Sequence, residues 1–339
     1  MKKLASLLLA AFVILFLVAS PALIAGGVHK NVYTIQEAEQ RAKYRGTLTV
    51  WHVVSFRTGS GSGVSLLQTR ATNFERSNPY VFIEVIGMTP EEYQERIARG
   101  ESPDILSYPM GMFSDASMFA DLPEAENLLP LFADCGKDGS AFKSYPYMAD
   151  IYQLLCNGEF FFEAGLSLPF ADDSALSQLL EMIPDLKNRE GIQPLTLWED
   201  SCASLPLRST VLSAEGLPGD NEAFITGQAA MTLCPRSYYR RLDDDQRANS
   251  LNIYSYGAGY ATDLVQMIGV LQSDDPAKIA MCADFCSSML SRSVQAKLAS
   301  LEMLPVVERV SAVYDEAIFG DLQKRGYVPN TFALAAGNF

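Results

Sequence analysis

The stretch Thr47-Leu-Thr-Val-Trp-His-Val53 is rich in the β-branched and aromatic residues that favour a strand. A glycine- and serine-rich loop follows it, and apolar residues then recur at helical spacing as far as Asn78-Pro79. Beyond that helix we expect a strand from Tyr80 to Ile86, a helix over 90–100 and a strand over 103–108. Strands and helices that alternate at this spacing predict parallel β–α–β units, and therefore an α/β fold with a helix-covered sheet.

The same kind of pattern restarts near residue 145 and continues to about residue 300. It predicts strands at 151–156 and 231–234, an apolar run at 264–271, short helices at 160–165 and 222–230, and a long helix over 276–300. Residues 169–219 contain few patterns that predict a helix or a strand. A second helix-covered sheet is therefore expected in the second half of the chain.

Length and charge restrict the class of protein. The 339 residues are enough for two domains, and 48% of them are hydrophobic, which indicates a globular chain. The formal net charge is −14. So acidic a surface repels nucleic-acid phosphates and anionic lipids, which excludes nucleic acid as an expected partner.

The N-terminus carries an export segment. Lys2 and Lys3 precede a charge-free apolar run that ends near Ala25, which is typical of a signal peptide. The run also nearly spans a bilayer core, so residues 1–25 are expected to be either a cleaved signal peptide or an N-terminal membrane anchor. Residues 26–45 then form a linker. In both cases the body of the chain lies outside the cytoplasm, in the periplasm or at the extracellular face of the cytoplasmic membrane.

Cysteine and histidine usage gives no metal site. The six cysteines permit disulfides in an exported protein, and sequence cannot separate their pairings. Cys282 and Cys286 share one face of a predicted helix, so we expect them to be buried apolar residues. His29 and His52 are the only imidazoles, and neither lies near a cysteine pair. Neither a metal nor a cofactor is expected.

Several segments occur in an order that resembles a known family. They are Gly46 to His52, Phe74-Glu-x-x-Asn-Pro79, Tyr93 to Ile105, Tyr145-Pro-Tyr147, Phe224-x-x-Gly-Gln-Ala-Ala-Met231, and Pro276 to Val306. Together they resemble the family 1 extracellular solute-binding proteins, the maltose-receptor type. The resemblance implies a periplasmic-binding-protein-like fold (type II), in which a hinge joins two discontinuous α/β lobes. One lobe would comprise 46–144 plus 262–305, and the other 145–261 plus 306–339.

The same resemblance implies the function. A small polar ligand, most simply a sugar or oligosaccharide, would bind between the lobes, which close by motion near 144–146, 260–262 and 305–307. The closed, monomeric receptor would then dock on the permease subunits of an ABC-type importer. The chain departs from many relatives because its first cysteine is Cys135, so no lipid-modified cysteine directly follows the export segment. Its second lobe is also short, which leaves the ligand and the state of its pocket open.

Candidate ligand-binding residues follow from the expected topology, because ligands of such sheets bind at the carboxyl ends of the strands. Aromatic faces and planar polar groups suit sugars, and Asp150 and Arg236 could bond sugar hydroxyls. Arg57 could pair with a carboxylate or phosphate. The candidates are Ser55, Phe56, Arg57, Tyr108, Tyr147, Asp150, Trp198, Arg236, Tyr238 and Tyr239. The adjacent loop Gly59-Ser-Gly-Ser-Gly63 lacks the lysine and hydroxyl residues that end a nucleotide-binding loop.

No catalytic constellation is recognisable, so an enzyme is not expected. The sequence contains no Gly-x-Ser-x-Gly motif, and Ser–His or Cys–His catalysis in the body of the chain would depend on His52. Two alternatives to a transport receptor remain open. One is a membrane-anchored sensory module that uses the same closure, and the other is an exported hydrolase.

Overall fold

The computed structural model describes residues 44–54, 56–163, 165, 196–197, 217–218, 223–224, 226, 228–237, 253–255, 262–310 and 328–337. The predicted export segment and nearly all of the predicted linker lie outside these ranges. Within them, no helix is both long enough and apolar enough to cross a membrane. Residues 44–46 and 78–81 form a small unit of their own, in which the Arg45 guanidinium lies 4.4 Å from the centre of the Tyr80 ring.

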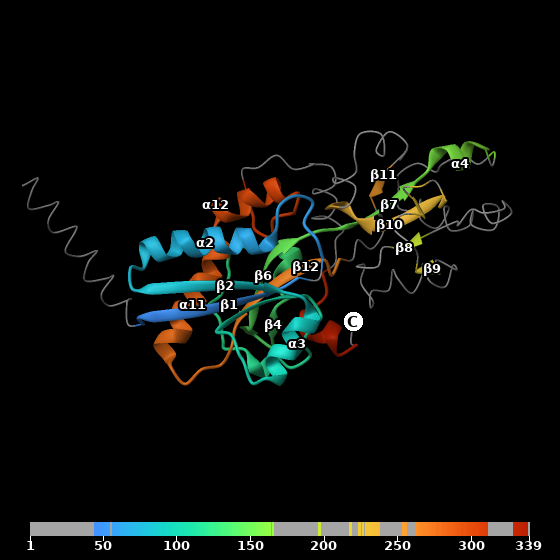
Figure 1. Ribbon diagram of the computed structural model, residues 1–339. Coiled ribbons are helices and arrows are strands. Elements are labelled where there is room, and N and C mark those ends of the chain that lie inside the picture. The colour runs from blue at the N-terminus through green and yellow to red at the C-terminus, as the bar shows by residue number, and fades with distance from the viewer. Residues whose placement is uncertain are drawn as a thin grey trace, which may run out of the picture. The chain divides into compact units, whose positions relative to one another are not determined.

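The first sheet has five strands in the order β2-β1-β3-β12-β6 (Figure 1). Their bounds are β1 Gly46–Val53, β2 Val81–Met88, β3 Ile105–Pro109, β6 Ser144–Ala149 and β12 Val265–Val270. β1 and β3 run parallel, whereas β12 is antiparallel to both β3 and β6. The strands predicted in the first half of the chain are therefore confirmed, with their ends shifted by one or two residues.

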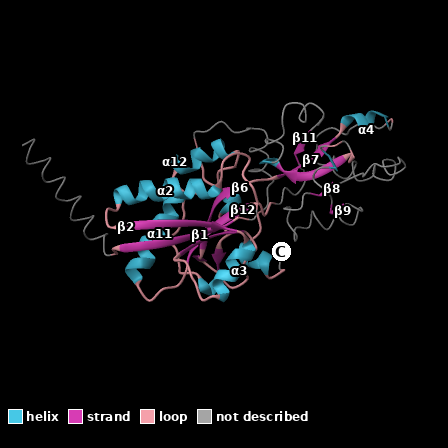
Figure 2. Ribbon diagram, in the orientation of Figure 1, coloured by secondary structure: helices cyan, strands magenta, loops and turns pink. Residues whose placement is uncertain are grey.

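Helices cover both faces of this sheet, as Figure 2 shows by colour. On one face, α2 (Gly63–Ser77) packs on α11 (Pro276–Met289), where the rings of Phe74 and Phe285 meet edge to face at 5.4 Å. On the other face, α3 (Pro90–Ala98) packs through Tyr93, whose ring lies 6.2 Å from that of Trp51. Thr89 and Glu92 form a capping box at the start of α3, which explains why this helix begins there.

The strand β6 was not predicted, because Pro146 lies at its centre. The structure places Pro146 opposite Met267, next to a shift of register between Gln266 and Met267. β6 also lies at the edge of the sheet, where the missing N–H of a proline disrupts no second ladder. Residues 145–149 therefore pair within the first sheet, although the sequence assigned them to the second lobe. The chain leaves this sheet at Asp150, later than the predicted hinge at 144–146.

The long helix predicted over 276–300 is in fact broken. α11 ends at Met289, α12 covers Arg292–Gln295, and a 3₁₀ helix, η3, covers Ala296–Leu301. The hydroxyl of Ser291 donates to the carbonyl of Ser288 at 2.8 Å. Serine side chains that bond to nearby carbonyls compete with helix continuation, and two such serines flank the break. Cys282 and Cys286 are buried free thiols on α11, as expected.

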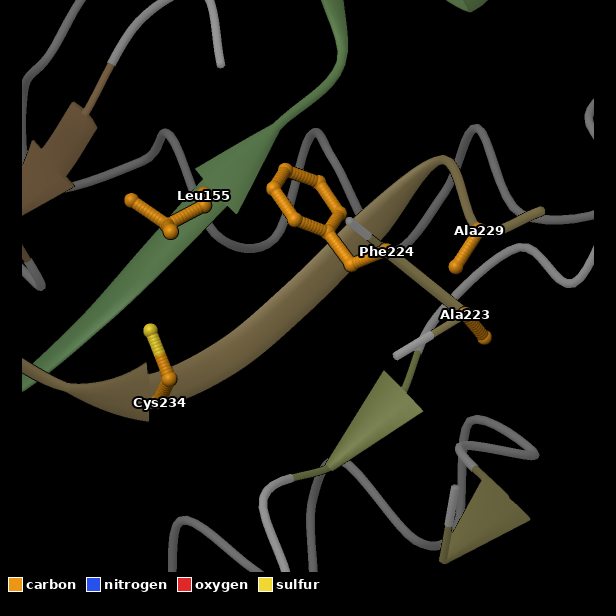
Figure 3. Close-up of a cluster of buried hydrophobic side chains, with 5 residues drawn as sticks. All are labelled: Leu155, Ala223, Phe224, Ala229 and Cys234. Carbon is orange, nitrogen blue, oxygen red and sulfur yellow. The ribbon is translucent and has the colours of Figure 1, made fainter. Parts of the chain in front are cut away.

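The second sheet has the order β11-β7-β10-β8-β9. Its strands are β7 Tyr152–Cys156, β8 Thr196–Leu197, β9 Leu217–Pro218, β10 Met231–Pro235 and β11 Ile253–Ser255. β7 is antiparallel to β10 and β11, and is followed by α4 (Gly158–Glu163). Figure 3 shows a cluster of buried side chains at this sheet, with Leu155 from β7, Cys234 from β10, and Phe224 beside them. The predicted strands at 151–156 and 231–234 are confirmed. Of the predicted helix at 222–230, the described residues 223–224 are helical, whereas 226 and 228–230 are not.

The remaining short elements lie outside these sheets. They are η1 Ala116–Met118, η2 Pro130–Phe132, the two-stranded pair β4 Lys137–Asp138 and β5 Ala141–Phe142, and α14 Thr331–Ala335. The N–H of Thr331 donates to the Cys135 carbonyl at 2.7 Å, and the Thr331 hydroxyl accepts from the N–H of Gly111 at 3.0 Å. α14 is therefore bonded to segments that surround the first sheet, although the sequence placed residues 306–339 in the second lobe. The lobe boundaries as a whole stay a prediction.

The contact between α2 and α11 generates the first prediction. Phe285 is fully buried, so Phe285→Ala removes a ring from the core and should lower the free energy of unfolding by about 3–5 kcal/mol. The matched control is Phe82→Ala, because Phe82 is 63% exposed and its loss should cost less than about 0.5 kcal/mol. Urea unfolding followed by circular dichroism measures both variants. Equal losses would show that the two helices do not share a core.

Candidate functional site

Asp150 lies where the chain leaves β6 and enters β7, and it is fully buried. Its carboxylate accepts hydrogen bonds from the backbone N–H of Ile151 at 2.9 Å and of Ser237 at 3.0 Å. Its own backbone N–H donates to the Leu264 carbonyl at 2.7 Å, and its carbonyl accepts from the Thr262 hydroxyl at 2.6 Å. One residue therefore connects the segments that follow β6, follow β10 and precede β12. We call the residues 150–151, 236–237, 262–264 and 302 the junction.

Arg236 follows β10 directly and is 4% exposed. Its backbone N–H donates to the Ile151 carbonyl at 2.8 Å, which extends the pairing of β10 with β7 into the junction. The guanidinium Nη1 donates to the carbonyl of Glu302 at 3.2 Å. The guanidinium Nε is buried and has no hydrogen-bond partner among the residues that the structure describes. Arg236 thus brings a charged donor group into the junction without using all of its donors.

The loop after β1 contacts the junction through its backbone. The Ser237 hydroxyl donates to the Arg57 carbonyl at 3.2 Å, and the N–H of Ser60 donates to the Leu301 carbonyl at 3.2 Å. Any side chain at Gly59 would start within 2.4 Å of the Glu302 Cβ, so only glycine allows this close approach. Glu302 itself has a left-handed backbone, with φ of 57°. The glycine-rich loop is therefore held by the junction, and a flexible linker is not needed to explain its composition.

A second polar cluster lies within the first sheet, next to the start of α2. The Nδ1 of His52 lies 2.8 Å from the Ser107 hydroxyl, which lies 2.9 Å from the Tyr147 hydroxyl. The Gln266 amide donates to Ser107 at 3.1 Å and to the Val53 carbonyl at 3.0 Å. The side chains of all four residues are buried, so the cluster connects β1, β3, β6 and β12 in the interior. Its satisfied hydrogen bonds explain why polar residues are tolerated there.

Burial changes the titration of both clusters. It lowers the pKa of His52 from 6.5 to about 4, so the imidazole is neutral at physiological pH. It also raises the pKa of Asp150 above its usual value, although hydrogen bonds to Ser237 and the nearby charge of Arg236 oppose that rise. A neutral histidine buried in a hydrogen-bonded cluster has a structural role in this conformation.

The predicted site residues are distributed unevenly. Asp150 and Arg236 meet in the junction, and Arg57 contacts it through its carbonyl while its side chain is exposed. Phe56 is buried in the same loop. Ser55, Trp198, Tyr238 and Tyr239 lie outside the described residues.

Tyr108 and Tyr147 are fully buried in the first sheet. The Tyr108 hydroxyl donates to Ser144 at 2.9 Å, and its ring stacks on Phe119 at 5.3 Å. In this conformation both tyrosines therefore pack in the interior, and their contact with a ligand stays a prediction.

Sequence reasoning missed Ser237, Thr262 and Glu302 as parts of the junction. Each bonds to residues far away along the chain, as Thr262 does to Asp150 across 112 positions. One signal was available, because Ser237 directly follows the arginine that we singled out.

No metal centre is indicated by the part of the chain that the structure describes. Those residues contain no group of three or more histidine, cysteine, aspartate or glutamate side chains that could hold an ion. The five described cysteines are all buried, and burial raises the pKa of Cys286 well above that of an ordinary thiol. These thiols are therefore poor nucleophiles and poor ligands.

The lowered pKa of His52 generates a prediction for stability against pH. The unfolded chain binds a proton near pH 6.5, whereas the folded chain does so only near pH 4, so unfolding is favoured by acid within this window. The free energy of unfolding should thus rise by up to about 3 kcal/mol between pH 4 and pH 6.5. Asp150 contributes in the opposite direction, because its raised pKa makes stability fall as pH increases through that pKa.

The variant His52→Asn isolates the histidine contribution, since its amide can still reach Ser107 but does not titrate. Urea unfolding between pH 4.5 and pH 7.5 should give a smaller rise for the variant than for the unmodified protein. Parallel curves for the two proteins would contradict the assigned pKa.

Comparison with solved structures identifies the fold, whereas comparison with family models and curated proteins does not. No family model matches the sequence, and no curated protein matches it either. Solved structures do match over most of the chain. The GacH receptor of Streptomyces glaucescens, solved unliganded and with acarbose, has a TM-score of 0.59 and 15% identity, over 88% of this chain and 95% of that one.

Two further structures agree with this match. The cyclic α-maltosyl-1,6-maltose binding protein of Arthrobacter globiformis has a TM-score of 0.61 and 15% identity, over 86% of this chain and 90% of that one. An ABC substrate-binding protein of Listeria monocytogenes in complex with cycloalternan has a TM-score of 0.57 and 16% identity, over 85% of this chain and 89% of that one. The chain therefore has the mixed α/β fold of the periplasmic binding proteins, and its structural neighbours across most of its length are carbohydrate-binding proteins of ABC transporters.

Proposed function

We propose that this protein is an exported receptor that binds a sugar or oligosaccharide and delivers it to the permease subunits of an ABC-type importer. The observation that carries the proposal is the fold, which extends over 88% of the chain in one comparison and matches binding proteins for several different oligosaccharides. None of these neighbours is described as an enzyme.

The junction supports a binding protein that closes over its ligand. It contains the passage from β6 to β7 at Asp150–Ile151 and the approach to β12 at Thr262–Leu264. A hinge is made of a few residues at the ends of elements that absorb a change in backbone angles. The ligand stabilises the closed form because it contacts both sides of the hinge only in that form.

The candidate residues suit a saccharide. Arg57 and Arg236 supply charged donors, and Trp198, Tyr238 and Tyr239 supply the aromatic faces on which sugar rings stack. Tyr238 and Tyr239 directly follow Ser237, which is a member of the junction. The proposed ligand site therefore extends from the junction along the segment that follows β10.

A ligand screen with the purified full-length protein tests this function. The panel contains neutral and acidic mono- and oligosaccharides, with amino acids, polyamines, phosphate and ferric ion as competing classes. A ligand present at 100 times its dissociation constant should raise the free energy of unfolding by about 2.7 kcal/mol, which is visible as a higher melting temperature. We expect a shift with one class of saccharide and with no other compound.

Two variants locate the binding. Tyr239→Ala should abolish the saccharide-dependent shift, whereas Tyr80→Ala should preserve it, since Tyr80 is an exposed tyrosine outside the proposed site. A shift with amino acids, polyamines, phosphate or iron, and none with any saccharide, would refute a sugar receptor.

A further inference from the structure

Arg236 retains a hydrogen-bond donor for which the described part of the chain supplies no acceptor. The side chain is 4% exposed, and its Nη1 donates to the Glu302 carbonyl, but its buried Nε has no acceptor among the described residues. Buried polar groups are almost always hydrogen-bonded, and an unmet donor on a charged group is especially unfavourable. The missing acceptor therefore points to a group that arrives with a ligand.

The carboxylate of Asp150 interacts electrostatically with Arg236, but its oxygens are already bonded elsewhere. One accepts from the N–H of Ile151 and the other from the N–H of Ser237. Among the described residues, the charge of Arg236 acts on Asp150 through space, and neither a hydrogen bond nor an ion pair joins their side chains. The carboxylate thus fixes the backbone next to Arg236 and does not accept a hydrogen bond from the Nε of that arginine.

The chemistry of the free group favours a carboxylate as its partner. A guanidinium presents Nε and an Nη as two parallel N–H donors, which match the two oxygens of a carboxylate better than a single hydroxyl. Arg57 approaches the junction only through its backbone, where its carbonyl accepts from the hydroxyl of Ser237, the residue next to Arg236. The positive charge that would attract an anionic group of the ligand is therefore that of Arg236.

We propose that Arg236 binds a carboxylate of the ligand, so that the saccharide taken by this protein is acidic, such as an oligosaccharide of uronic acids. This inference rests on the proposed function and specifies its ligand class. Arg236 is then the residue that distinguishes an acidic sugar from its neutral counterpart, and Asp150 is a positioning residue that holds it in place.

The test compares sugars that differ only in the group that Arg236 would bind. Isothermal titration calorimetry with the full-length protein measures digalacturonate against galactobiose, with equivalent pairs from the gluco and manno series. In each pair, the carboxylate on each of the two sugar residues is exchanged for a hydroxymethyl group. The acidic member of at least one pair should bind at least tenfold more tightly than its neutral counterpart.

The variant Arg236→Lys retains the positive charge but removes Nε and the planar pair of donors. It should weaken binding of the acidic sugar at least tenfold, and it should change binding of the neutral sugar less than twofold. The matched control is Arg292→Lys on α12, an exposed arginine that should leave both affinities unchanged. Circular dichroism checks that each variant is folded. If Arg236→Lys does not fold, the ratio of the two affinities in the unmodified protein still decides the question.

The outcomes separate this inference from the function on which it rests. Tight binding of an acidic sugar that is lost in Arg236→Lys supports both. Binding of neutral sugars equal to or tighter than that of their acidic partners overturns the acidic ligand and leaves the sugar receptor intact. No binding of either kind overturns both.

Discussion

The carboxylate of Asp150 is the constraint on which the rest of the site depends. It is fully buried, and it accepts hydrogen bonds from the backbone N–H groups of Ile151 and Ser237. Ser237 lies 87 positions after Asp150 in the chain. A buried acceptor of this kind is costly to leave unsatisfied, so the bonds fix the paths of both segments. Arg236, the loop after β1, and the turn at Glu302 then take their positions from those paths.

The fold could be predicted where local sequence and tertiary structure favour the same conformation. β1, α2, β2, α3 and β3 follow from residue type and spacing, because each is an ordinary element with a buried face. β6 could not be predicted in this way, since Pro146 is acceptable only at the sheet edge and beside a shift of register, and neither is visible from the sequence. The break after α11 depends likewise on serine hydroxyls that bond to carbonyls of their own turn.

The site was predicted less completely than the fold. Asp150 and Arg236 were singled out as candidate ligand-binding residues, and the structure brings both into one junction. Their bonds to Ser237, Thr262 and Glu302 are long-range contacts that no spacing rule reveals. Tyr108 and Tyr147 were expected at a binding surface, but both are buried in the first sheet. Aromatic residues near strand ends pack in the interior as readily as they line a binding surface.

The His52 cluster has a structural role within the first sheet. A histidine that is buried, hydrogen-bonded to Ser107 and neutral down to about pH 4 stabilises the first sheet, and in this conformation a substrate does not reach it. The structural neighbours are binding proteins, which agrees with that assignment. The described residues thus form two sheets connected by a junction, in which the buried Nε of Arg236 has no acceptor among them.

Small-angle X-ray scattering, recorded with and without a saccharide that binds, measures closure at this junction most directly. The account predicts that the saturating saccharide reduces the radius of gyration, while a non-binding sugar at the same concentration leaves it unchanged. An unchanged radius of gyration at full saturation would contradict closure and would assign the sugar to a site that does not act on the hinge.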